Sequence, residues 1–330
     1  MKQGAVNRHE SESGEKGRGT AGRIVKLLAR PCKRTEMMLR TELAGKLAIS
    51  IVLAGVYAGI VLGQEQDQSE KQNPSEKQTQ GRSPDRTQSG NQEEITAVPN
   101  RPTLATTAEA VQRGVFEIEY GFEAAKGHQN INGLLKWGMF KNLELWFLNN
   151  PIQREAGIAG MGDSGAGFKY RIVSQAKALP TISILYIAAL PTATAGLGVG
   201  AVGHTVQILL SKDFGKHHFD LNYGPQFLGR PGASGFDQNY FSALSYSRPI
   251  TGKWGYTAEV AGFSRANPAT PATMTLLNAA TYNVSPRLVL DCGVFVAVYG
   301  HLPRVNFIGG VTYSIADLYH LHSSRRSAKN

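Results

Sequence analysis

The sequence predicts an all-β protein: a transmembrane, antiparallel, up-and-down β-barrel of about 12 strands, preceded by a signal peptide and a disordered linker. Three observations lead to this fold class. Side chains alternate between apolar and polar over segments of about ten residues, a hairpin pattern recurs along the chain, and short connections alternate with long ones. The composition agrees, because a charged fraction of 18% is high for a helical membrane protein and low for a soluble one.

The N-terminal part of the chain carries an export signal. Residues 47–63 are apolar, uncharged and rich in small residues, the pattern of a signal peptide that spans 37–63. An uncleaved membrane anchor is the alternative for this run. Residues 1–36 are polar and without periodicity, so we expect either a disordered extension or a misassigned start that precedes Met37.

Composition divides the remaining chain into a linker, a barrel and a tail. Residues 64–100 are rich in Gln, Ser, Glu and Asn and cannot bury a core, which predicts a disordered polar linker. The barrel is expected over 101–316 and a C-terminal tail over 317–330. Cys32 and Cys292 lie on opposite sides of the expected cleavage site, which excludes a disulfide framework in the mature chain.

The strands are predicted from period-two alternation. In 115–122, for example, Phe116 and Ile118 alternate with Glu117 and Glu119. No stretch after residue 100 shows a helical period over ten or more residues. The predicted strands are 115–122, 131–140, 143–149, 165–172, 180–190, 205–211, 218–227, 239–248, 254–263, 273–284, 288–299 and 304–316.

Short turns join these strands in pairs. Residues 278–299 form two apolar arms around Ser285-Pro286-Arg287, which predicts a β-hairpin, and similar phrases recur at 139–145, 213–221 and 249–256. Longer loops rich in Gly, Pro and Ala are expected at the other end, at 123–130, 150–163, 191–203, 228–238, 264–272 and 300–303. This asymmetry is typical of an outer-membrane barrel, whereas a soluble β-sandwich, the alternative, needs no such alternation.

Charged residues within the strands identify the inner face of the barrel. A charge that faces lipid at mid-depth is costly, so charged residues of alternating strands are expected to face the lumen. Together these charges could line a polar path or close it by salt bridges, and for any single residue a structural role is favoured over a role in transport. The candidate lumen-lining residues are Glu117, Glu119, Glu144, Lys169, Arg171, Asp220, Glu259 and Asp291.

Three stretches carry a resemblance to a known family. They are RPTLATTAEAVQRGVFEIEYGF at 101–122, GMGDSGAGFKYRI at 160–172 and LPTISILYIAALPT at 179–192. The chain resembles, over about 101–316, the family of outer-membrane transporters labelled "MetA-pathway of phenol degradation". The resemblance implies a β-barrel with a transport role.

The sequence predicts a passive channel for small compounds, hydrophobic or aromatic ones among them, in the bacterial outer membrane. The alternatives are a structural or adhesion barrel with a closed lumen and an outer-membrane lipid hydrolase. The expected partners are outer-membrane lipid and lipopolysaccharide, the barrel-assembly machinery and a small-molecule solute. Nucleic acid is not expected despite the net charge of +10, because no basic helix or aromatic platform accompanies that charge.

Other motifs were weighed as sites of chemistry. Gly198, Gly200 and Gly203 match a dinucleotide-binding pattern, but that reading needs a following helix, and a strand is predicted there. His217-His218 and the histidines of the tail lack a third ligand at metal-binding spacing. No serine and histidine are singled out as a catalytic pair. We therefore expect no cofactor, no metal ion and no catalytic residue.

Overall fold

The computed structural model describes residues 94–300 and 304–321. The chain divides into two units, Met1–Pro74 and Ser75–Asn330, and all described residues belong to the second. The predicted extension and signal peptide, most of the linker and most of the tail lie outside the described residues.

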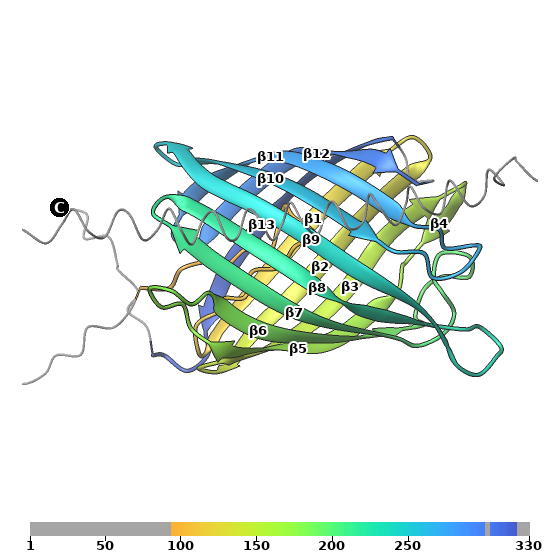
Figure 1. The fold of residues 1–330 in the computed structure, drawn as a ribbon, viewed down its shortest axis with the longest axis horizontal. Coiled ribbons are helices and arrows are strands. Elements are labelled where there is room, and N and C mark those ends of the chain that lie inside the picture. The colour runs from red at the N-terminus through yellow and green to blue at the C-terminus, as the bar shows by residue number, and fades with distance from the viewer. Residues whose placement is uncertain (1–93, 301–303, 322–330) are drawn as a thin grey trace, which may run out of the picture. The chain divides into compact units, whose positions relative to one another are not determined.

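The described residues form one antiparallel sheet that closes into a barrel (Figure 1). Each strand pairs with its neighbours along the chain, and β1 closes the ring by pairing with β13, from Val115 opposite Asp317 to Ala124 opposite Phe307. The strands are β1 Val115–Ala125, β2 His128–Phe140, β3 Leu143–Glu155, β4 Ile158–Gly160, β5 Ser164–Val173, β6 Thr181–Leu190, β7 Gly203–Phe214, β8 His217–Gly229, β9 Phe236–Thr251, β10 Trp254–Phe263, β11 Thr273–Ser285, β12 Leu288–Tyr299 and β13 Val305–Asp317.

Twelve long strands form the wall, which confirms the predicted fold class. The three-residue β4 pairs only with the end of β3. Within the part of the chain that the structure describes, each of the twelve long strands has a neighbour on both sides, as a sheet surrounded by lipid requires. Among the described residues, none lies in a helix long and apolar enough to cross a membrane.

Two of the predicted long loops are wrong in part. Residues 123–130 and 150–163 were expected as loops, but β1 and β2 run on to a turn at Lys126-Gly127, and β3 and β4 form a hairpin around Ala156-Gly157. Gly127, Gly157 and Ala156 have positive φ angles of 78°, 89° and 47°, which let the chain reverse tightly. The polar, glycine-rich composition there belongs to strand ends rather than to loops.

Inner and outer faces of the wall differ in chemistry. Along β5, Lys169 is fully buried, whereas the neighbouring Phe168 and Tyr170 are 38% and 47% exposed. Large apolar side chains such as Ile208 and Phe307 are likewise exposed on other strands. An apolar outside around a polar inside is the arrangement of a barrel surrounded by lipid.

Candidate functional site

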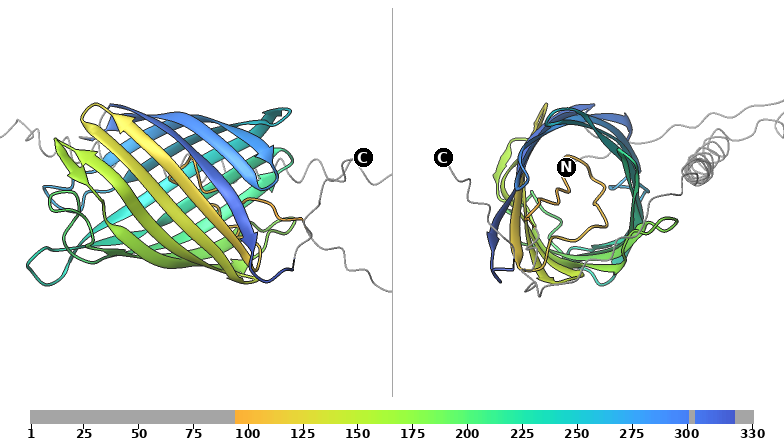
Figure 2. Two further views of the ribbon diagram at one scale, coloured as in Figure 1. Left: turned by 180° about the vertical axis from the view of Figure 1, so that it is seen from behind. Right: turned by 90° about the vertical axis from the view of Figure 1, so that its left-hand side faces the viewer.

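Residues 94–114, called the lumen segment below, lie inside the barrel. The view along the barrel in Figure 2 shows this orange part of the chain within the ring of strands. The segment starts near the short-turn end, where the Ala97 amide donates to the Pro286 carbonyl (2.8 Å), and it returns to that end to begin β1 at Val115. The lumen segment was not predicted: its first residues fall in the stretch 64–100, for which a linker is expected, and the rest falls in the expected barrel, which begins at 101.

The first limb of the lumen segment is bound by β1 and β2. The Val98 amide donates to Glu117 (3.0 Å), and the Asn100 and Arg101 amides donate to Glu119 (3.0 and 3.1 Å). Lys136 of β2 lies 2.6 Å from Glu117 and 2.5 Å from Glu119, and it donates to the Val98 carbonyl. The carboxylates therefore hold the backbone of the segment, and the one ammonium group between them neutralises half of their charge.

The tip of the lumen segment is bound on the opposite strands. The Leu104 and Ala105 amides both donate to Glu259 of β10, at 3.0 and 2.6 Å. The Arg101 guanidinium forms an ion pair with Asp291 of β12 (3.2 Å). Ala105 also packs against an apolar cluster that includes Phe241 and Ala261.

The second limb is bound strand by strand. Asn222 of β8 bonds to both the amide and the carbonyl of Thr106, at 2.5 and 2.8 Å. The Ala108 amide donates to Ser211, whose hydroxyl donates to Asp220 (2.6 and 2.5 Å). Further along, the Thr107 carbonyl accepts from Lys169 (3.2 Å), the Ala108 carbonyl accepts from Ser183 (2.6 Å), and the Val111 amide donates to Glu144 (2.6 Å).

All eight candidate residues lie on the side of the wall that faces the lumen segment. Seven are buried, and Arg171, which is half-buried, pairs with Glu109 of the segment (2.7 Å). Asp220 reaches the segment only through Ser211. The seven buried residues are Glu117, Glu119, Glu144, Lys169, Asp220, Glu259 and Asp291.

Lys136 and the uncharged residues that hold the segment are not among the lumen-lining residues predicted from the sequence. Lys136 is fully buried on the same face as Glu117. The residues around it, 134–140, are apolar on both faces of the strand, so alternation does not distinguish the two faces there. The signal that would have found it is the charge itself, because a lysine in the middle of a strand is costly toward lipid. Ser183, Ser211 and Asn222 carry no such signal.

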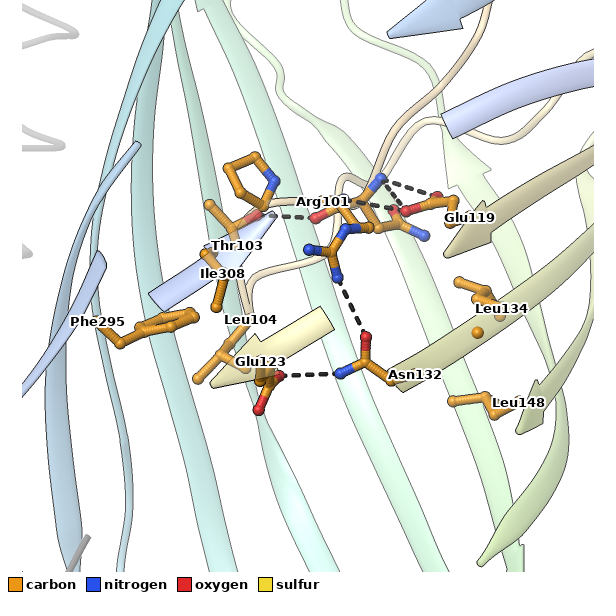
Figure 3. Close-up of a pocket in the computed structure, with 13 residues that line it drawn as sticks. Arg101, Thr103, Leu104, Glu119, Glu123, Asn132, Leu134, Leu148, Phe295 and Ile308 are labelled. Carbon is orange, nitrogen blue, oxygen red and sulfur yellow. Dashed lines mark hydrogen bonds between the residues drawn. The ribbon is translucent and has the colours of Figure 1, made fainter. Parts of the chain in front are cut away.

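An apolar layer lies beyond the charged groups, toward the long-loop end of the wall. On β2 Leu134 follows Lys136 in this direction, on β10 Ala261 follows Glu259, and on β12 Phe295 lies beyond Asp291. A cavity of about 220 Å³ lies between this layer and the tip of the lumen segment. Its apolar lining residues include Leu104, Leu134, Leu148, Phe295 and Ile308, and its polar ones include Asn100, Arg101, Glu119, Glu123 and Asn132 (Figure 3).

The motifs weighed as sites of chemistry have other contacts. The loop with Gly198 and Gly200 leads into strand β7, and Asp163 orders it by accepting from the Ala193 and Val199 amides (3.0 Å each). His217 bonds to Tyr246 (2.8 Å), and His218 bonds to Asp213 and Asp220. Within the described ranges, no group of three His, Cys, Asp or Glu residues is arranged to hold a metal ion.

The protein is thus a β-barrel of the kind that crosses membranes, with a closed ring of strands and a segment of its own chain bound inside the lumen. No protein-family profile matches the sequence, and no curated protein matches it. The resemblance to the phenol-degradation family therefore stays a prediction.

Solved structures similar to the chain are outer-membrane channels. The KdgM porin is 10% identical, with a TM-score of 0.46 over 61% of this chain and 99% of that chain. An outer-membrane channel from Pseudomonas putida F1 is 16% identical, with a TM-score of 0.46 over 62% and 96%. The CymD monoaromatic hydrocarbon channel is 11% identical, with a TM-score of 0.38 over 70% and 96%. All three TM-scores are below 0.5, so the proposed function rests on the contacts within the lumen and not on these similarities.

Proposed function

We propose that this protein is a passive channel for small solutes in the bacterial outer membrane, and that the lumen segment closes it in this conformation. The observation that carries the proposal is how the segment is held: from Val98 to Val111 its backbone is bound by side chains of the wall, not by strand pairing. Such contacts are non-covalent and can be exchanged for water. The export signal and the apolar outside support the location.

The ion pairs of the wall support a channel over a structural barrel. Glu117 is the register partner of Lys136 on adjacent strands, and Glu144 is the register partner of Lys169. These pairs therefore run along the wall and do not bridge the lumen. In this proposal the lumen is closed by the lumen segment, which can leave it. A structural or adhesion barrel would instead be stabilised by ion pairs that bridge the lumen.

The cavity beside the segment tip supports the proposal that the solutes are small apolar or aromatic compounds. Its volume of about 220 Å³ exceeds the roughly 150 Å³ of an apolar cavity that accommodates benzene. Leu134, Leu148, Phe295 and Ile308 offer apolar contact, while Glu123 and Asn132 can bond to one polar substituent. This proposal includes the transport role that the family resemblance implies, with phenol-like compounds as one class to test.

Assembly partners follow from the location. A barrel in the outer membrane contacts lipid and lipopolysaccharide, and we propose that the barrel-assembly machinery inserts it. The hydrolase alternative finds no support from the histidines at the wall: His128, His204, His217 and His218 bond to carboxylates or to tyrosine hydroxyls, not to serine.

Single-channel recording in a planar bilayer tests the proposal. We expect the refolded protein to show small or rare openings, and a variant that lacks residues 95–112 to show steady ohmic steps of larger conductance. Folding of both is checked by heat-modifiable migration in electrophoresis. Silence from a folded, inserted deletion variant would overturn the channel and favour the structural barrel.

A further inference from the structure

Arg101 lies in a binding site that the barrel wall builds around its guanidinium group. Asp291 of β12 accepts from both Nε and a terminal nitrogen (3.2 Å each), and the Gly309 carbonyl of β13 accepts from that terminal nitrogen (3.1 Å). Asn132 of β2 accepts from the other terminal nitrogen (3.2 Å). A planar fork of donors that meets a carboxylate through two bonds is specific to guanidinium.

The orientation of these acceptors is fixed by the wall. The Asn132 amide nitrogen donates to Glu123 (2.9 Å), which directs its oxygen toward Arg101. The Asp291 side chain is only 2% exposed. All four acceptor atoms thus come from β2, β12 and β13, so the site is complete without the rest of the lumen segment.

Two glycines make room for the flat group. Gly121 of β1 and Gly310 of β13 are register partners, and a Cβ atom added to either would overlap with the Arg101 guanidinium. Any other residue at these positions would fill the site. The wall is therefore shaped for a flat cation, and a lysine ammonium, with its tetrahedral donors, would not match the same acceptors.

The cavity gives a solute access to this site. Arg101 forms part of the cavity lining, with Glu123 and Asn132 nearby and Leu134, Leu148, Phe295 and Ile308 around the remaining sides (Figure 3). Four of the five guanidinium N–H groups are used by the wall acceptors. Withdrawal of the segment would leave the Asp291 carboxylate without its cation, which is unfavourable for a buried charge unless another cation replaces it.

We propose that Asp291, Asn132 and the Gly309 carbonyl form a binding site for small guanidines that carry a short apolar substituent, and that Arg101 is its internal occupant in the closed channel. The inference rests on the proposed function for its physiological use, since a solute then exchanges with Arg101 as the segment tip leaves. The apolar substituent would lie against Phe295 and Ile308.

Ligand binding to Arg101→Ala, measured by saturation-transfer NMR in detergent, tests the site. Ethylguanidinium is the probe, and ethylammonium, with the same charge and substituent, is the control. We expect saturation transfer to ethylguanidinium in the variant and not in the wild-type protein, whose site is filled. Adding Asp291→Asn is expected to weaken binding at least about tenfold, because the charge-assisted contact to the carboxylate is lost. Adding Gly310→Ala is also expected to weaken binding, because its Cβ atom would occupy the position of the guanidinium.

Several results would overturn the site: no transfer to ethylguanidinium in folded Arg101→Ala, equal transfer to ethylammonium, or binding unchanged by Asp291→Asn. Heat-modifiable migration establishes folding, and the 95–112 deletion, which also removes Arg101, replaces Arg101→Ala if that variant does not fold. Binding in detergent requires no conduction. Absence of conduction in the bilayer would therefore not contradict the guanidine-binding site, and absence of guanidine binding would not contradict the gated channel.

Discussion

Lys136 links the wall to the lumen segment through a single ammonium group. It contacts Glu117, Glu119 and the Val98 carbonyl, and its side chain has no exposed surface. Two buried carboxylates that also hold backbone amides would repel one another without this cation. Lys136 therefore reduces the repulsion between the two carboxylates on which the first limb depends.

Replacement of Lys136 by Met is expected to destabilise the folded barrel by about 3–5 kcal/mol, the usual cost of a buried charge left without its partner. Urea-induced unfolding in detergent measures the change. Lys141→Met, at an exposed turn, is the matched control and should change stability by less than about 0.5 kcal/mol. Equal stability of the two variants would contradict the role of Lys136.

Phe168 tests the outer face. Its side chain is 38% exposed and lies next to Tyr186, with ring centroids 5.7 Å apart. We expect Phe168→Asp to impair membrane assembly, because a carboxylate toward lipid is unfavourable, whereas Phe168→Leu should assemble normally. The fraction of heat-modifiable barrel in isolated membranes measures this. A normal fraction in Phe168→Asp would show that this face does not contact lipid.

At the scale of the element, the lumen segment is a piece of chain whose backbone partners are side chains. A strand supplies its neighbour with regular backbone bonds, but this segment depends on a succession of wall side chains, each of which holds one or two of its backbone groups. Single substitutions of wall residues that bond to the segment alone, such as Glu259, are therefore expected to change the stability of the segment more than that of the barrel.

Glu259→Gln is expected to loosen the tip of the lumen segment. The carboxylate accepts from the Leu104 and Ala105 amides, and an amide side chain offers one acceptor oxygen in its place. Exchange of the two backbone amides with deuterium should become about tenfold faster, as expected for one lost charge-assisted bond. Glu155→Gln at the exposed end of β3 is the control, and equal exchange in both variants would contradict the role of Glu259.

At the scale of the whole molecule, the open lumen should select cations. Among the described wall residues that face the lumen segment or the cavity, seven carboxylates stand against three cations: Glu117, Glu119, Glu123, Glu144, Asp220, Glu259 and Asp291 against Lys136, Lys169 and Arg171. We expect the reversal potential of the 95–112 deletion variant in a KCl gradient to show preference for K⁺. A preference for Cl⁻ would mean that these carboxylates do not face the open path.

The wall could be predicted from the sequence, and the lumen segment could not. Alternation within one strand is a local pattern, so Phe116 and Glu117 identify both faces of β1. The bond between Leu104 and Glu259 joins residues 155 apart in the sequence, and nothing near Leu104 announces it. The segment has no periodicity because it contacts one strand after another, from β1 at Val98 to β10 at Leu104 and β8 at Thr106. Composition alone therefore made its first residues look like linker.

The return of the lumen segment to its own starting end has a topological consequence. Residues 97 and 115 both lie at the short-turn end, so the segment enters the barrel as a loop and does not thread through it. The ring from β1 to β13 can then close before the loop is inserted, and the loop can leave the lumen without breaking the pairing between any two strands of the wall. Folding of the wall and insertion of the segment can therefore be separate events, because the segment enters and leaves by the same end of the barrel.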